Sequence, residues 1–102
     1  MNPETDMAFA LVSALRAESK KTGTPIAGVK LIDAFVMAGQ KGLDAMEHLG
    51  AAAELLKEAR LCVLTVVSRD RRDRIEETLD LTQAGYEASD AEVRVALYPD
   101  VS

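Results

Sequence analysis

The chain has 102 residues, 48% of them hydrophobic and 28% charged, which is the balance of a folded protein of one domain rather than of a disordered tail. It has four aromatic residues and no Trp, which leaves few side chains for unpaired bases to stack on and disfavours single-stranded nucleic-acid binding. The net charge of −5 gives no general attraction for nucleic acid, so DNA binding would need a local basic patch.

The residues that the chain lacks disfavour catalysis and membrane insertion. One histidine, His48, and one cysteine, Cys62, make neither a catalytic triad nor a zinc set, so we expect no enzyme, metal or cofactor site. The first residues are acidic where a secretory signal would be basic, and no apolar stretch is long enough to span a membrane. We therefore expect a cytoplasmic protein.

The N-terminal half predicts helices. Asn2 suits an N-cap, Pro3 the first helical position and Gly23 the residue after the end, so we expect a helix over about 3–21. Thr24-Pro25 marks the start of a second helix, over about 25–38. Its predicted apolar face consists of Ile26, Val29, Ile32, Phe35 and Val36.

Two shorter helices are predicted next. The first covers about 43–49, with Leu43, Met46 and Leu49 facing inward and Gly50 ending it. The second covers about 51–60. Its predicted buried positions are Ala52, Leu55, Leu56 and Ala59.

The pattern changes at Leu61, where a run of β-branched residues predicts a strand over about 61–67. Residues 75–88 fit two patterns, because 75–81 alternates apolar and polar side chains like a strand while Ile75, Leu79 and Tyr86 also fall on one helical face. Alternation of Val93, Val95 and Leu97 predicts a last strand over about 92–98.

Two folds follow from this ambiguity. If 75–81 is a strand, the chain is mostly α with a small β-hairpin (α+β), in the layout of a winged helix-turn-helix. If 69–88 is a helix, the N-terminal helices pack on a β-α-β unit with a right-handed crossover. Two strands alone are marginal, so this alternative needs a sheet completed by dimerisation.

The segment 29–88 resembles multiple-antibiotic-resistance-type (MarR-type) regulators, which are winged-helix proteins. The wings of that family carry Asp-Arg near the tip and end in Leu-Thr-x-x-Gly, and this chain has Asp73-Arg74 followed by Leu81-Thr82-Gln83-Ala84-Gly85. Residues 43–50, which end in Leu49-Gly50, are similar to the first helix of the family's helix-turn-helix. The resemblance implies a DNA-binding transcription regulator in which Thr82 caps the following helix.

The basic residues of this region are the candidate nucleic-acid contacts. Four arginines fall between the two predicted strands of the hairpin, where a wing could bring them to a minor groove. The helix over 51–60 adds two basic residues, but it also carries Glu54 and Glu58, which phosphates would repel. The candidate set is Arg69, Arg71, Arg72, Arg74, Lys57 and Arg60.

Two functions therefore remain open. The first is a small DNA-binding, transcription-regulatory protein that contacts duplex DNA through the arginine-rich wing. The alternative is a non-enzymatic protein-interaction module, such as a phage or mobile-element accessory factor, that competes with nucleic acid for a basic protein partner. For both we expect a homodimer, because a chain this small with a long apolar first helix has surface to share.

Overall fold

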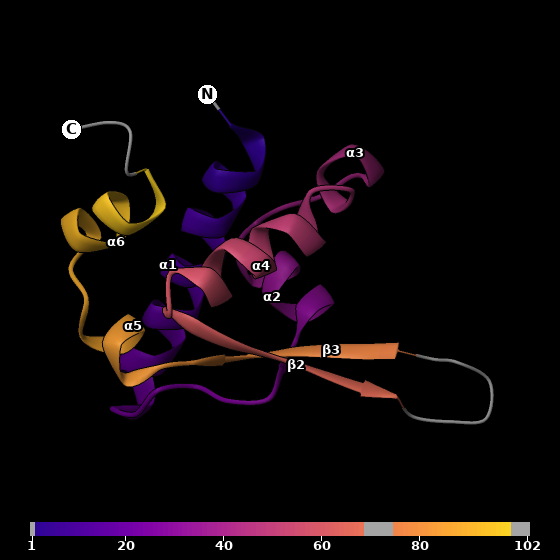
Figure 1. Cartoon of the computed structure of the whole chain (residues 1–102). Helices are drawn as coiled ribbons and strands as arrows, with labels where there is room; N and C mark the ends of the chain where they lie inside the picture. The colour runs from indigo at the N-terminus through magenta and orange to yellow at the C-terminus, as the bar shows by residue number, and fades with distance from the viewer. Residues whose placement is uncertain (1, 69–74, 99–102) are drawn as a thin grey trace.

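The chain folds into helices packed on a small three-stranded antiparallel sheet (Figure 1), and the computed structural model describes residues 2–68 and 75–98. The elements in chain order are α1 (Pro3–Thr22), β1 (Val29–Lys30), α2 (Leu31–Met37), α3 (Leu43–Met46), α4 (Leu49–Glu58), β2 (Cys62–Ser68), β3 (Ile75–Leu81), α5 (Gln83–Glu87) and α6 (Asp90–Leu97). The sheet has the strand order β1-β3-β2, and in Figure 1 the long strands β2 and β3 run below α2 and α4.

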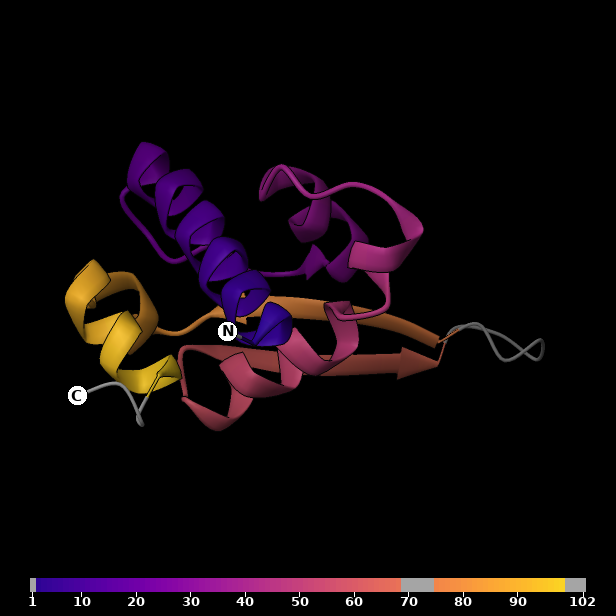
Figure 2. The same cartoon turned by 90° about the horizontal axis from the view of Figure 1, so that it is seen from above.

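Helix α1 is the centre of the packing and confirms the first predicted helix. The Asn2 side chain accepts a hydrogen bond from the backbone N–H of Glu4 at 3.0 Å, and Gly23 ends the helix with a φ of +80°. Seen from above in Figure 2, α2 and α3 lie on one side of α1, and α5 and α6 lie on the other. The apolar stripe of α1 packs into the core of the same chain. Its buried residues are Met7, Ala8, Leu11, Val12 and Leu15.

The second helix is shorter than predicted, and its predicted apolar face is correct at Phe35 but wrong at Ile32 and Val36. Residues 29–30 form β1, and the Ile26 carbonyl accepts a hydrogen bond from the Leu81 N–H at 2.8 Å, so this segment runs along β3 and α2 starts at Leu31. Helix α2 buries Leu31, Ala34 and Phe35. Ile32 and Val36 are exposed instead, because α2 packs the side that carries its buried residues against the core.

The third and fourth helices also differ from the prediction. Helix α3 has four residues and buries none, and Leu43, predicted to face inward, is 80% exposed. Helix α4 begins at Leu49 and runs through Gly50, which therefore does not end a helix. Leu49, Ala52 and Leu56 are buried, as predicted. Ala53 is buried as well, although it was not predicted to be. Leu55 and Ala59, which were predicted to be buried, are half-buried.

The hairpin resolves the ambiguity of residues 75–88 in favour of a strand followed by a short helix. Strands β2 and β3 pair antiparallel, with Cys62 opposite Leu81 and Val67 opposite Glu76. The alternative β-α-β unit is therefore wrong, because residues 75–81 pair directly with the strand before them. Pairing buries Leu79 and Leu81 against the helices, which a helix over the same residues could not do.

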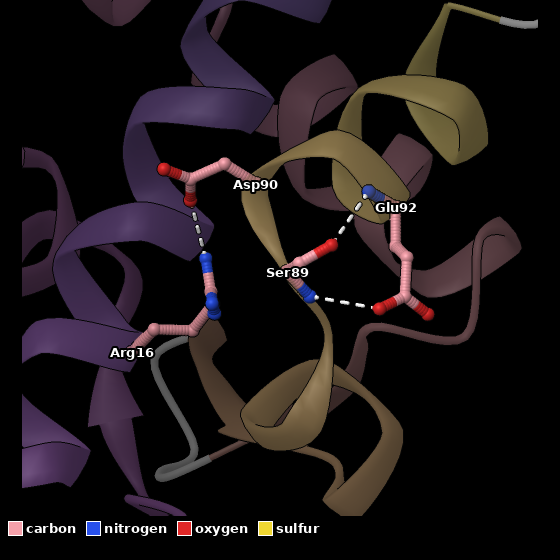
Figure 3. A network of polar contacts seen from close by, with 4 residues as sticks. All are labelled: Arg16, Ser89, Asp90 and Glu92. Atoms are coloured by element: carbon pink, nitrogen blue, oxygen red, sulfur yellow. Dashed lines mark hydrogen bonds and ion pairs between the residues drawn. The ribbon is translucent and has the colours of Figure 1, made fainter.

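The predicted last strand, over about 92–98, is wrong, since residues 90–97 form helix α6. Ser89 and Glu92 make a capping box in which the Ser89 hydroxyl accepts from the Glu92 N–H and the Glu92 carboxylate accepts from the Ser89 N–H, both at 3.2 Å (Figure 3). Val93 and Leu97, four residues apart, face the core while Val95 is 71% exposed. The apparent alternation is thus part of a helical repeat.

Helix α6 is held to α1 by polar contacts at both of its ends. Arg16 of α1 donates to the Asp90 carboxylate at 2.7 Å (Figure 3), and the Tyr98 hydroxyl donates to the Asp6 carboxylate.

The described helices include none with the length and apolar character that a membrane crossing requires.

Candidate nucleic-acid interface

The predicted candidate residues divide into two groups. Arg69, Arg71, Arg72 and Arg74 lie outside the residues that the structure describes, between the end of β2 at Ser68 and the start of β3 at Ile75. Lys57 and Arg60 are described, and both are exposed near the point where α4 leads into the hairpin. The structure thus places Lys57 and Arg60 near the start of the hairpin, whereas the four arginines lie in sequence between its two strands.

The exposed surface of α4 carries both signs of charge. The Lys57 ammonium lies 3.7 Å from the Glu54 carboxylate, with the two side chains 57% and 54% exposed. Glu58 follows directly and is exposed as well. Such a surface pair contributes little to stability, but it partly neutralises Lys57 toward a phosphate. Arg60 makes no ion pair with the described residues, so it is the less encumbered cation of the two.

Arg60 occupies an unusual backbone position. Its φ is +62°, in the left-handed region that favours glycine. The Arg60 N–H donates to the Lys57 carbonyl and the Leu61 N–H donates to the Leu56 carbonyl, both at 3.0 Å, which is the Schellman pattern that ends helices. Glycine is the usual residue at this position, so an arginine here is held at a cost of about 1 kcal/mol.

A set of contacts fixes this turn to the end of the hairpin, and we call it the α4–hairpin junction, made of Arg60, Leu61, Thr82 and Gly85. The Thr82 hydroxyl lies 2.8 Å from the Arg60 carbonyl oxygen and 2.9 Å from that of Leu61. The same hydroxyl oxygen accepts from the Gly85 N–H at 2.9 Å, which confirms Thr82 as the N-cap of α5.

Gly85 completes the junction by close approach. A Cβ added at this position would lie 2.3 Å from the Leu61 carbonyl oxygen and 2.9 Å from a Leu81 methyl carbon, so no other residue fits without a backbone shift. The Leu-Thr-x-x-Gly motif therefore has a physical role here. Its threonine and its glycine join the end of β3 to the turn that carries Arg60.

The lone cysteine and the lone histidine of the sequence lie in different parts of the fold. Cys62 is buried at the start of β2, and burial, with a smaller contribution from the Asp80 carboxylate, raises the pKa of its thiol to about 12. His48 lies 3.8 Å from the Glu4 carboxylate on the surface. These described residues contain no group of three His, Cys, Asp or Glu side chains that could hold a metal ion.

The left-handed turn at Arg60 is the feature that sequence reasoning missed. The charge of Arg60 made it a candidate DNA contact in the sequence. Its left-handed backbone could have been suspected because the predicted helix ends without a glycine directly before the predicted strand. The Glu54–Lys57 pair, at a spacing of three residues, was also open to prediction from sequence.

No protein-family model, no curated protein and no solved structure gives a significant match to this chain.

Proposed function

We propose that the chain is a non-enzymatic, winged-helix-like protein that binds duplex DNA through the C-terminal end of α4 and the β2–β3 hairpin. The order of elements supports this proposal, since a helical segment leads directly into an antiparallel hairpin that pairs with a short strand placed earlier in the chain. In this layout α4 is the recognition helix and the hairpin is the wing. DNA binding implies work inside the cell, in keeping with the cytoplasmic location expected from the sequence.

The observation that carries the proposal is the strained position of Arg60. Backbone strain that a glycine would relieve is concentrated at functional sites in proteins. Here the strained residue is an exposed arginine between the end of α4 and the start of the hairpin, and Thr82 and Gly85 hold the turn in place. An exposed arginine whose backbone is held in this way suits a phosphate contact, which positions a protein on DNA without reading its sequence.

The acidic residues of α4 limit what the protein can read. Glu54 and Glu58 flank Lys57 on the exposed side of the helix and would repel phosphates as the helix entered a major groove. We therefore propose binding that depends on phosphate contacts and is weakly selective for sequence. The four arginines of residues 69–74 remain the predicted additional contacts of the wing.

The test is titration of a labelled DNA duplex with the full chain at low ionic strength, followed by fluorescence anisotropy. We expect binding that weakens as salt rises. A double Lys57→Gln, Arg60→Gln variant should bind less tightly, with the salt slope reduced by about 1 for each phosphate that the variant no longer neutralises. Lys41→Gln, at an exposed position between α2 and α3, is the control for the loss of one positive charge and should bind like the unaltered chain. Failure of the unaltered chain to bind any duplex would refute the proposal.

A second candidate function, a protein-interaction module, is favoured by the α2–α3 segment (residues 31–46). This segment exposes five large apolar side chains. The Gln40 backbone N–H donates to the Phe35 carbonyl at 3.1 Å, which holds the start of the α2–α3 loop against the end of α2. Asp33, Asp44 and Glu47 are exposed around these side chains without an ion pair to the described residues. The exposed apolar side chains are Ile32, Val36, Met37, Leu43 and Met46.

Apolar side chains among carboxylates suit a basic amphipathic helix, which is the partner this candidate requires. The probe is a synthetic helix with Leu on one face and Lys on the other. Asp44→Lys and Leu43→Asp should weaken its binding, whereas Glu87→Lys and Val95→Asp, matched changes at exposed positions on α5 and α6, should not. If both pairs of variants lose the same amount of affinity for the synthetic helix, net charge alone attracts the helix, and the protein-interaction function is ruled out.

A further inference from the structure

The two edges of the sheet are protected very differently. Strand β1 forms one edge with two residues, and its Lys30 is paired with Glu76 of β3 at 3.1 Å. Strand β2 forms the other edge with seven residues and carries no charge and no proline. Natural proteins usually shorten, charge or cover an edge strand, because its unpaired backbone groups would otherwise pair with another chain. Edge β1 follows this rule and edge β2 departs from it.

The side chains of β2 are also open to solvent. Val63 is 51% exposed, Val66 57% and Val67 39%, and Thr65 between them is exposed. Cys62 and Leu64 pack toward the core. Three exposed valines on one edge strand are a costly surface for a protein to leave in water, since each retains apolar area that pairing would bury.

Two hydrogen bonds at the end of β3 show which backbone groups face the open edge. The Thr82 N–H donates to the Leu61 carbonyl at 3.0 Å, and the Leu81 N–H donates to Ile26 at 2.8 Å, on the β1 side. In an antiparallel ladder the direction alternates with every residue. With the register of β2 and β3, residues 63, 65 and 67 therefore turn their N–H and C=O groups toward β3. Residues 62, 64 and 66 turn theirs away from it.

We propose that this edge pairs with β2 of a second copy of the chain, antiparallel and around a two-fold axis at Thr65. In that register Leu64 of one copy lies opposite Val66 of the other, so that outward-facing backbone groups meet outward-facing groups. Val63 then lies opposite Val67, an apolar cross-strand pair on the exposed face. The register uses all seven residues of the strand.

The distribution of charge on the chain favours a second copy as the partner of the β2 edge. The chain has a net charge of −5, so most arrangements of two copies bring carboxylates together. Residues 62–68 contain no charged side chain, so pairing through β2 places no like charges opposite one another on the joined strands. The two-fold axis also closes the assembly at two copies, which a β2-to-β1 contact would not do.

The size of the contact sets the expected affinity. Seven residues span about 23 Å, and such a strand pair alone is smaller than a standard interface of about 800 Å² on each partner. The dimer should therefore be weak and depend on protein concentration. The inference rests on the sheet and its edge, and it holds whether or not the chain binds DNA.

The test is sedimentation velocity of the full chain over a wide concentration series without DNA. We expect a reversible monomer–dimer equilibrium, and Val66→Lys should raise the dissociation constant at least about tenfold, because a lysine on an edge strand opposes pairing. Val95→Lys makes the same change at a 71% exposed position of α6 and should leave the equilibrium unchanged. A monomer at every concentration, a dimer unaffected by Val66→Lys, or growth beyond a dimer would each overturn the proposal.

Amide hydrogen exchange gives a second readout that fold stability does not mimic. The amides of Leu64 and Val66 should become more protected as concentration rises, because their N–H groups face the second copy. The amide of Thr65 faces β3 and should be protected equally at all concentrations. Protection of Leu64 and Val66 that does not change with concentration would contradict edge pairing.

Discussion

The α4–hairpin junction and the α2–α3 segment differ in how their side chains are used. At the junction a hydroxyl, two carbonyls and a glycine without a side chain meet within hydrogen-bond distance. In the α2–α3 segment, leucine, valine and methionine side chains remain in solvent and α3 buries nothing. The comparison teaches that hydrogen bonds and a close approach hold the turn that presents Arg60, whereas the most apolar exposed surface lies on α3 and on the outer side of α2.

The largest expected difference is the cost of removing a leucine. Leu56 on α4 is fully buried, so Leu56→Ala should lower the free energy of unfolding by about 3 kcal/mol through lost burial and the cavity left behind. Leu43 on α3 is 80% exposed, so Leu43→Ala should change it by less than about 0.5 kcal/mol. Urea unfolding of the two variants measures both values. Equal losses would show that α3 is packed as tightly as α4.

A glycine pair tests the junction itself. Gly85→Ala forces a Cβ to within 2.3 Å of the Leu61 carbonyl oxygen and should cost about 2 kcal/mol or more in unfolding free energy. Gly50→Ala, in the exposed first turn of α4, meets nothing within 4 Å and should be neutral or slightly stabilising. Denaturant midpoints of both variants give the comparison, and a harmless Gly85→Ala would mean that the close approach does not hold the junction.

Thr82 should show a smaller loss that depends on its hydroxyl. Thr82→Ala removes the N-cap of α5 and the hydrogen bonds to the Arg60 and Leu61 carbonyls, which should cost about 1–2 kcal/mol. Thr82→Ser keeps the hydroxyl and should recover most of that loss. The same unfolding measurement distinguishes the two, and an equal loss in the serine variant would assign the effect to the threonine methyl group instead.

The effect that is smallest at neutral pH, because it appears only above about pH 9, is a pH dependence at the start of β2. Burial raises the pKa of the Cys62 thiol to about 12 from its ordinary value of 9.0, so the unfolded chain ionises at a lower pH than the folded one. The stability that the protonated thiol contributes is complete below pH 9 and is lost as the pH rises from about 9 to about 12. Cys62→Ala should show a shallower decline over this range. Tyr98, whose pKa is also raised to about 12, is present in both chains and cancels in the comparison.

Local signals predicted the parts of the fold that depend on neighbouring residues. The Asn2–Pro3 start and Gly23 end of α1, the run of β-branched residues in β2 and the Thr82 cap all depend on residues close in the chain, so their sequence patterns were sufficient. The choice between strand and helix for 75–81 needed the pairing with β2, which is a longer-range contact. The sequence allowed both.

The errors have the same physical origin. The segment 25–30 is helix-prone by pattern, but hydrogen bonds to Leu81 and Asp80 of β3 draw it out along the sheet. The alternation of Val93, Val95 and Leu97 fits a strand, but the Ser89–Glu92 capping box and packing on α1 favour a helix. Among the candidate site residues, the positions of Lys57 and Arg60 were predictable from charge and order. The left-handed backbone of Arg60 depends on the junction and was not.

The central claim is that the strain at Arg60 serves nucleic-acid binding, and the variant Arg60→Gly tests it most directly. Glycine adopts a φ of +62° without strain, so the variant should unfold at higher denaturant, with a gain of about 1 kcal/mol. The same variant should bind a DNA duplex less tightly than the unaltered chain in a parallel anisotropy titration at low ionic strength. A variant that is more stable and binds duplex as tightly as before would contradict the claim.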